Sequence, residues 1–260
     1  MPHRDRYPQG VPCWVELQTT DQQGAKAFYA ALFGWKLDDE PLPFGGHYTM
    51  ASLEGGTVAG ITPQPPDTPE SRPPAWMTYL AVDDLPTVVD RVTAAGGQVL
   101  APPMQVMDSG SMAVVADPTG GVVGLWQADR HPGSQTVNQP GAVIWNELIT
   151  PEPDRAAAFY DAMLGTTHDN VPMGDGDTYT VLKVDGREVA GAMALPEHAG
   201  VPTAWTVYFA TDDLATTVAA ATKLGASVLN QVDSPAGPLA VMTDPQGSVF
   251  QVMHPTEWPD

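Results

Sequence analysis

The chain has 260 residues and carries 31 Asp and Glu residues against 11 Lys and Arg, which gives a formal net charge of −20. A surface of this sign repels phosphate backbones and anionic lipids, so nucleic acid and membranes are excluded as partners. The single cysteine, Cys13, rules out an intrachain disulfide and a cysteine-based zinc site. No apolar stretch has the length of a signal-peptide core or a membrane span, so we expect a soluble cytoplasmic protein.

An internal repeat organises the chain. Residues 14–34 begin Trp-Val-Glu-Leu and end Leu-Phe-Gly, and residues 145–165 begin Trp-Asn-Glu-Leu and end Met-Leu-Gly. A second pair, residues 79–120 and 208–247, begins with Tyr and ends with Asp-Pro-x-Gly. Self-similarity at this spacing predicts four related units arranged as two halves.

Each unit is predicted to have β-α-β-β-β order. In the first half, alternation and helical spacing predict strands at 13–20, 35–38, 48–53, 57–61, 77–82, 99–101, 111–116 and 122–127, with helices that begin after Asp21 and Asp84. In the second half they predict strands at 144–150, 179–184, 188–193, 206–211, 227–230, 239–243 and 249–253. The predicted fold is therefore α+β, with an N-terminal domain 1–127 (units 10–62 and 75–127), a linker 128–141 and a C-terminal domain 142–260 (units 142–196 and 203–255).

This plan resembles the vicinal oxygen chelate superfamily, which includes glyoxalase I, bleomycin-resistance proteins and extradiol dioxygenases. The resemblance rests on Phe-Tyr…Leu-Phe-Gly-Trp at 28–35 and Asp-Pro-Thr-Gly at 117–120, and it covers nearly the whole chain. More narrowly, the chain is similar to a tandem actinobacterial subgroup that includes a culture-filtrate antigen of mycobacteria. The resemblance implies that units pair into two curled, barrel-like sheets, each enclosing a cavity.

The resemblance also places the superfamily's metal ligands on the first and last strands of the units. The corresponding positions here hold Trp14, Met77, Gly124, Trp145, Thr206 and Gln251. Trp, Met and Gly are not ordinary ligands of a divalent cation, so we expect no metal and no other cofactor. The six histidines (His3, His47, His131, His168, His198 and His254) lack ligand spacing and are interpreted as surface or turn residues.

Period-two alternation indicates which residues share the inward face with these positions. In the first half they are Trp14, Glu16, Gln18, Met77, Tyr79, Gly124 and Trp126. In the second half they are Trp145, Glu147, Ile149, Thr206, Tyr208, Gln251 and Met253. Aromatic walls with a few polar groups are typical of a small-molecule pocket, and the first half is the more open and more aromatic one.

Glu16 and Glu147 are the candidate catalytic residues, with Tyr79 and Tyr208 as their partners. A carboxylate next to Trp on an inward face is partly desolvated, which raises its pKa and suits it to proton transfer. A phenol could stabilise a developing oxyanion. A purely structural role, in which each Glu bonds a tyrosine or a backbone amide, stays open.

We therefore predict a protein that binds a small planar or carbonyl-bearing metabolite without a metal, with acid–base chemistry of an isomerase, cyclase, lyase or hydroxylase type. The ligand-binding candidates are Trp14, Gln18, Met77, Gly124, Trp126, Trp145, Thr206 and Gln251. Two alternatives remain: a non-catalytic protein that sequesters a small molecule or drug, and a metal-dependent glyoxalase or dioxygenase with atypical ligands. Four units in one chain are compatible with a monomer or a homodimer.

Overall fold

The computed structural model describes residues 3–42, 45–65, 68–69, 72–174, 177–194 and 201–259. The N-terminal half contains β1 (Pro12–Thr19), α1 (Gln22–Phe33), β2 (Lys36–Pro41), β3 (His47–Leu53), β4 (Gly56–Pro63), β5 (Ala75–Ala81), α2 (Leu85–Ala94), β6 (Gln98–Val106), β7 (Gly110–Ala116) and β8 (Val122–Ala128). The C-terminal half contains β9 (Val143–Thr150), α3 (Pro153–Leu164), β10 (Thr167–Gly174), β11 (Asp177–Val184), β12 (Arg187–Ala194), β13 (Ala204–Ala210), α4 (Leu214–Lys223), β14 (Ser227–Ser234), β15 (Gly237–Thr243) and β16 (Val249–Met253). The predicted α+β plan of four β-α-β-β-β units is confirmed.

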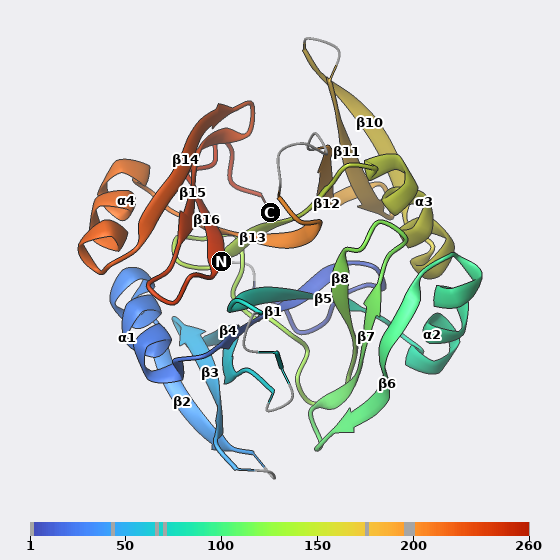
Figure 1. Cartoon of the computed structure of the whole chain (residues 1–260), viewed down its shortest axis with the longest axis horizontal. Helices are drawn as coiled ribbons and strands as arrows, with labels where there is room; N and C mark the ends of the chain where they lie inside the picture. The colour runs from blue at the N-terminus through green and yellow to red at the C-terminus, as the bar shows by residue number, and fades with distance from the viewer. Residues whose placement is uncertain are drawn as a thin grey trace.

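The eight strands of each half form one sheet. The strand orders are β2-β3-β4-β1-β5-β8-β7-β6 and β10-β11-β12-β9-β13-β16-β15-β14. The units of a half join where their first strands pair antiparallel, and the last strand of each unit lies parallel to its first strand. Figure 1 shows the two sheets back to back, with the central strands near the middle of the molecule and the edge strands at the periphery.

Helices α1, α2 and α4 begin after an aspartate whose side chain caps the first turn, whereas α3 begins after Glu152, which makes no capping bond. The side chain of Asp21 accepts a hydrogen bond of 2.9 Å from the Gly24 amide at the start of α1. Gly34 ends this helix with a φ of 72°, a left-handed conformation that costs glycine little. In the part of the chain that is described, no helix is long and apolar enough to cross a bilayer.

The four edge strands differ most from the sequence prediction. The strand β10 was not predicted, and β6, β14 and β2 extend beyond the predicted 99–101, 227–230 and 35–38. All four lie at the edges of their sheets, where side chains are mostly exposed and alternation is therefore weak. Pro102 and Pro103 interrupt the pattern of β6, yet an edge strand tolerates proline because one side of it has no pairing partner.

The two halves share their cores along a seam formed by the helices. Helix α1 lies beside α4 and α2 lies beside α3, and each pair joins one unit from each half (Figure 1). Residues of both halves belong to the same apolar clusters, for example Phe28 with Phe250 and Leu125 with Phe159. The covered outer faces of the two sheets therefore form a common core.

Two equivalent hydrogen-bond chains cross the seam. The Tyr29 hydroxyl donates to Asp244 Oδ2 at 3.0 Å and accepts from Trp76 Nε1 at 3.0 Å. In the other chain, the Tyr160 hydroxyl donates to Asp117 Oδ2 and accepts from Trp205 Nε1. Each acceptor is the Asp of an Asp-Pro-x-Gly turn of the opposite half, so these turns hold the halves together.

Residues 129–136 of the linker run across one end of the N-terminal sheet. The His131 amide donates to the Ser109 carbonyl at 3.0 Å, and the Ser134 amide donates to the Cys13 carbonyl at 2.7 Å. The Thr136 amide then reaches the Thr57 carbonyl at 3.1 Å. The linker thereby covers the starts of β1 and β4 and places His131 against the concave face.

Candidate functional site

A carboxyl group on β1 is the centre of the N-terminal concave face. Glu16 Oε1 accepts hydrogen bonds from the Tyr79 hydroxyl at 3.3 Å and from Gln18 Nε2 at 3.2 Å. The Tyr48 hydroxyl also lies next to Glu16, and it accepts from Trp14 Nε1 at 2.9 Å. The antiparallel register of β1 and β5, which pairs Trp14 with Tyr79, brings together the residues from separate units.

The pKa values of Glu16, Tyr48 and Tyr79 all lie above their ordinary values. Burial raises the pKa of Glu16 above its ordinary value, although hydrogen bonds from Gln18, Tyr48 and Tyr79 lower it in part. Burial, and then the neighbouring charge of Glu16, raises the pKa of Tyr48 and of Tyr79 well above the usual range. Both phenols are therefore hydrogen-bond donors at neutral pH, and Glu16 is a more basic carboxylate than one in water.

The C-terminal concave face repeats this arrangement with tighter bonds. Glu147 Oε1 accepts from the Tyr179 hydroxyl at 2.7 Å, and Oε2 accepts from the Tyr208 hydroxyl at 2.6 Å. The Tyr179 hydroxyl accepts from Trp145 Nε1 at 2.9 Å. Both oxygens of Glu147 are thus engaged and the residue is 4% exposed, whereas Glu16 is only partly buried. Burial again raises the pKa of the carboxyl group.

Glycines make room for the tyrosines. A Cβ atom at Gly60 would lie 2.0 Å from the Tyr48 hydroxyl, and one at Gly191 would lie 1.8 Å from the Tyr179 hydroxyl. Tyr48 and Tyr179 were not among the predicted site residues. The signal was present: in both halves, the tyrosine follows the site tryptophan by 34 positions, and the glycine lies in an identical Val-Ala-Gly segment.

The two faces differ where the last strand meets the second tyrosine. In the N-terminal half, Gly124 pairs with Tyr79, and a Cβ atom at Gly124 would lie 2.2 Å from the Tyr79 ring. In the C-terminal half, Gln251 occupies this place and donates to the Thr206 hydroxyl at 3.0 Å. The Thr206 hydroxyl in turn bonds the backbone of β9 at 3.2 Å. The predicted polar residues of the C-terminal face are therefore bonded to one another.

The prediction that His131 is a surface or turn residue is corrected by its position on the concave face. Its ring packs edge-on against Trp14, at 4.4 Å between ring centroids, and lies 5.8 Å from the ring of Trp126. Its backbone carbonyl accepts from Trp126 Nε1 at 2.9 Å. Burial lowers the pKa of His131 to about 4, so the ring is neutral at neutral pH and packs as an aromatic side chain. The position of His131 on the concave face could not be predicted from the sequence, because the linker that carries it has no periodicity.

The donors on these faces do not fit an ordinary divalent metal site. Across the described part of the chain, no group of three or more His, Cys, Asp or Glu residues could hold a metal ion together. Each face offers one carboxylate surrounded by phenol, indole and thioether groups, among them the buried Met77. Ordinary divalent sites need several imidazole, carboxylate or thiolate ligands.

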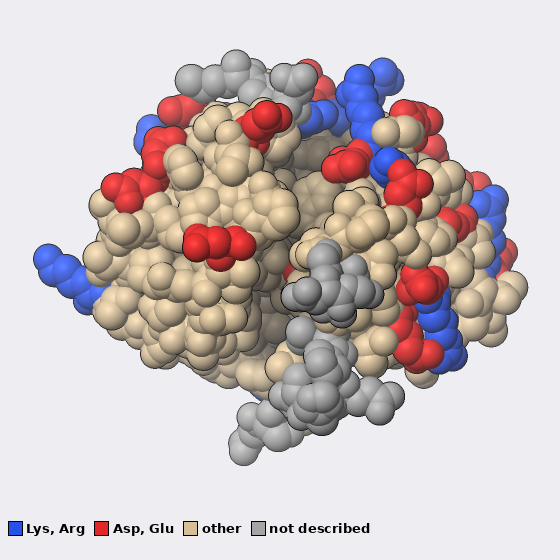
Figure 2. Space-filling view, turned by 90° about the horizontal axis from the view of Figure 1, so that it is seen from above, with Lys and Arg blue, Asp and Glu red and all other residues tan. Residues whose placement is uncertain are grey.

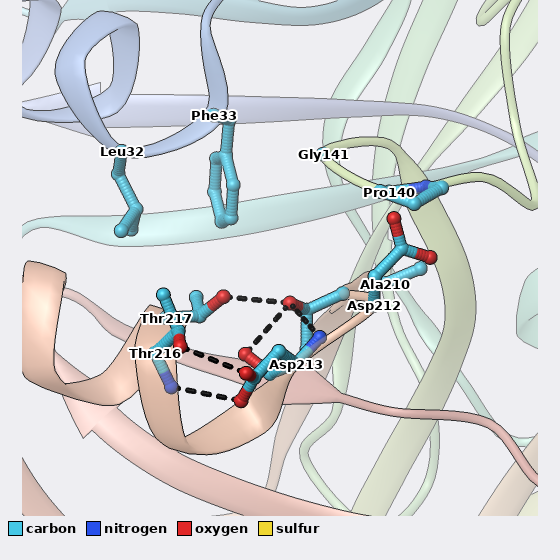
Figure 3. A pocket seen from close by; sticks show the side chains of 10 residues that line it. Leu32, Phe33, Pro140, Gly141, Ala210, Asp212, Asp213, Thr216 and Thr217 are labelled. Atoms are coloured by element: carbon cyan, nitrogen blue, oxygen red, sulfur yellow. Dashed lines mark hydrogen bonds between the residues drawn. The ribbon is translucent and has the colours of Figure 1, made fainter.

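Hollows also occur away from these residues. Figure 2 looks onto the side of the C-terminal half and shows a hollow in the middle of this face, with acidic side chains along parts of its rim. A cavity of about 280 Å³ lies at the seam of α1 and α4 (Figure 3). Another, of about 260 Å³, lies between the start of α2 and β6.

Paired β-α-β-β-β units, whose central strands carry a polar cluster on a concave face, define a protein of the glyoxalase and dioxygenase type. Residues 13–124 match the family described as "Glyoxalase/Bleomycin resistance protein/Dioxygenase superfamily", and residues 143–253 match "Glyoxalase-like domain". The chain belongs to this superfamily, as a tandem of two such domains.

Relatives of known name cover nearly the full chain. CFP32 of Mycobacterium tuberculosis, which is named as a provisional glyoxylase, is 51% identical over 98% of each chain. The "Anthracycline biosynthesis protein DnrV" of Streptomyces peucetius is 36% identical over 95% of this chain and 94% of its own. Among solved structures, a Mn(II)-bound glyoxalase from Novosphingobium aromaticivorans is similar with a TM-score of 0.68 and 15% identity, over 98% of this chain and 85% of its own. At this identity the likeness concerns the fold alone.

Proposed function

We propose that the concave face of the N-terminal half binds a small, planar, carbonyl-bearing molecule and that Glu16 transfers protons on it without a bound metal. The observation that supports this most is the state of Glu16: a carboxyl group of raised pKa, only partly buried, between two phenols that stay protonated. A base of this kind is suited to abstract a proton near neutral pH.

The chemistry is proton transfer beside a carbonyl group. Glu16 accepts the proton of a C–H bond next to the carbonyl, and the electron pair of that bond moves toward the carbonyl oxygen. The hydroxyl of Tyr79 donates a hydrogen bond to the resulting enolate oxygen. Return of the proton to another carbon gives isomerisation, and loss of a leaving group gives elimination. The Trp14–Tyr48 hydrogen bond holds the second phenol beside the carboxyl group.

The planar shape of the ligand is inferred from the walls and from a relative. Trp14 and Trp126 belong to the apolar cluster of this face, and the neutral ring of His131 packs against both. DnrV takes its name from anthracycline biosynthesis, and anthracyclines are planar polycycles with several carbonyl groups. A ligand of this type would match flat apolar walls with a few polar groups.

The C-terminal face has a structural role in this proposal. Both oxygens of Glu147 accept short hydrogen bonds from tyrosines and the residue is buried, so it is less accessible to a substrate than Glu16. The state of Glu147 favours the second candidate function, a non-catalytic role in which the concave face binds a small molecule or only stabilises the fold. The same alternative applies to the whole protein if Glu16 proves dispensable for turnover.

Binding and metal content are tested on the purified protein. Native mass spectrometry of protein prepared without chelator or added metal should show no bound divalent ion; one ion per chain would contradict the metal-free proposal. A hydroxyanthraquinone should quench tryptophan fluorescence with saturation, and Trp14→Phe should weaken this binding. The matched variant Trp145→Phe should bind as the wild type does, and equal losses in both variants would contradict the assignment to the N-terminal face.

A further inference from the structure

One seam between the halves is closed by a glutamine side chain. Gln9 Nε2 donates to the carbonyl of Leu164, at the end of α3, at 2.8 Å. Gln9 Oε1 accepts from the amide of Asp83, just before α2, at 3.3 Å. The next residue, Gly10, fixes the segment because its amide donates to the Ala81 carbonyl at 2.8 Å. A carboxamide group therefore joins the end of α3 to the residues that precede α2.

The equivalent position at the other seam has no such group. Gly141 occupies the place of Gly10, since its amide donates to the Ala210 carbonyl at 2.9 Å in the same way. The residue before it is Pro140, in the place of Gln9. The carbonyl of Phe33 and the amide of Asp212 correspond to the two partners of Gln9. Among the described residues, neither of these backbone groups has a hydrogen-bond partner.

The helix ends at the two seams have nearly the same dihedral angles. Gly34 and Gly165, which end α1 and α3, have φ and ψ of 72° and 22°, and of 77° and 22°. Asp84 and Asp213, which begin α2 and α4, have φ and ψ of −141° and 93°, and of −145° and 102°. The local backbone at these helix ends is therefore alike, and the Phe33 carbonyl and the Asp212 amide are the counterparts of the two groups that bind Gln9 at the α2–α3 seam.

A cavity of about 280 Å³ lies where this side chain is missing (Figure 3). Leu32 and Phe33 reach it from α1, and Thr216 and Thr217 reach it from α4. The polar side chains of this wall are already bonded: the Thr216 hydroxyl donates to Asp213 Oδ2 at 2.8 Å, and Thr217 shares a bond of 2.6 Å with Thr211. The two threonine hydroxyls are thus already bonded, and the Phe33 carbonyl and the Asp212 amide remain for a ligand on this side of the cavity.

The same cavity has an apolar side and an acidic side. The side chains of Leu32 and Phe33 offer contact to a hydrocarbon or a ring (Figure 3). Asp212 and Asp213 line the opposite rim and are exposed, so an anion would be repelled there. The ligand that fits is neutral or cationic, with a small apolar body.

We propose that the cavity between α1, α4 and Pro140 binds a small molecule with a primary carboxamide group. The N–H of the carboxamide donates to the Phe33 carbonyl, its oxygen accepts from the Asp212 amide, and its body contacts Leu32 and Phe33. The ligand takes the place that Gln9 has at the other seam. This site is separate from both concave faces, and its occupation bridges the two halves.

Nicotinamide is a suitable probe because it combines a primary carboxamide with a small flat ring. Titration of the ¹⁵N-labelled protein with nicotinamide should shift the amide resonance of Asp212 with saturation in the millimolar range. Nicotinate, which differs by a carboxylate in place of the carboxamide, should leave this resonance unchanged. No saturable shift at Asp212, or an equal shift with nicotinate, would overturn the proposal.

Variants at Pro140 separate occupation of the cavity from general effects. Pro140→Gln supplies the chain with its own carboxamide, so it should fill the cavity, move the Asp212 resonance without ligand and weaken nicotinamide binding by at least about tenfold. Pro140→Ala removes the ring without filling the cavity and should bind nicotinamide as the wild type does. Undiminished binding by Pro140→Gln, or equal loss in both variants, would contradict the assigned site.

Discussion

The hydroxyl of Tyr160 bridges the two halves, and its removal has a cost that follows from the structure. It donates to Asp117 Oδ2 at 3.0 Å and accepts from Trp205 Nε1 at 2.9 Å. Tyr160, Trp205 and Asp117 are 1%, 5% and 4% exposed, so water cannot replace the lost oxygen without a rearrangement. Tyr160→Phe leaves a buried indole N–H and one carboxylate oxygen without this partner.

The expected loss of stability is the sum of the free-energy contributions of the two hydrogen bonds. A neutral bond contributes about 1 kcal/mol and a bond to a charged group about 1.5–3 kcal/mol, so Tyr160→Phe should destabilise the protein by about 3 kcal/mol. At about 2–4 °C per kcal/mol for a chain of this size, the melting temperature should fall by roughly 6–12 °C. Urea unfolding followed by tryptophan fluorescence, together with calorimetry, measures both quantities.

Tyr29, the counterpart of Tyr160 in the other half, tests the same reasoning independently. Tyr29→Phe breaks the equivalent bonds to Asp244 and Trp76, both 3.0 Å long, and should cost a similar amount. A loss below about 1 kcal/mol in either variant would refute the reasoning, because it would mean that these buried groups find other partners at little cost.

Three further predictions concern the concave face. Burial lowers the pKa of His131 to about 4 in the folded protein, against an ordinary value of 6.5. The contribution of its neutral ring to stability is therefore present above pH 6.5 and is lost as the pH falls toward 4. His131→Gln should remove up to about 3 kcal/mol of this acid destabilisation, which urea unfolding at several pH values measures. Burial raises the pKa of Glu16 above its ordinary 4.5, so its contribution is present below pH 4.5 and is lost as the pH rises through the folded value. Glu16→Gln should therefore flatten the pH dependence of unfolding above pH 4.5, and an unchanged profile would contradict the burial of this charge. Gly124→Ala should destabilise by about 1–3 kcal/mol, because the new methyl group would lie 2.2 Å from the Tyr79 ring; an unchanged denaturation midpoint would show that the ring moves freely.

The repeat made most of the fold predictable. Period-two alternation in the first strands and Asp caps before three of the four helices are local signals, and their repetition along the chain allowed the strand–helix order of four units to be inferred. The pairing of Glu16 with Tyr79 also followed, since both side chains are inward residues on the two first strands of a half.

What the sequence did not show depends on tertiary contacts. Tyr48 reaches Glu16 from an outer strand, across β4, because Gly60 has no side chain to block it. His131 enters the concave face from a linker whose path is set by bonds to Ser109 and other distant backbone groups. Tyr29 has the helical spacing of any core residue, and only the docking of the halves shows that it bonds Asp244. None of these contacts leaves a periodic signal in one chain.

Exchange of protons on a test ketone measures the proposed role of Glu16 most directly. 2-Tetralone in D₂O exchanges the hydrogens next to its carbonyl group, and ¹H NMR follows the rate after binding has been established by fluorescence quenching. The wild type should accelerate this exchange, Glu16→Gln should reduce the acceleration by about 10²–10⁴-fold with unchanged affinity, and Glu147→Gln should retain it. Exchange by Glu16→Gln at the rate of the wild type, or bound ketone that no form of the protein exchanges, would contradict acid–base catalysis at this site.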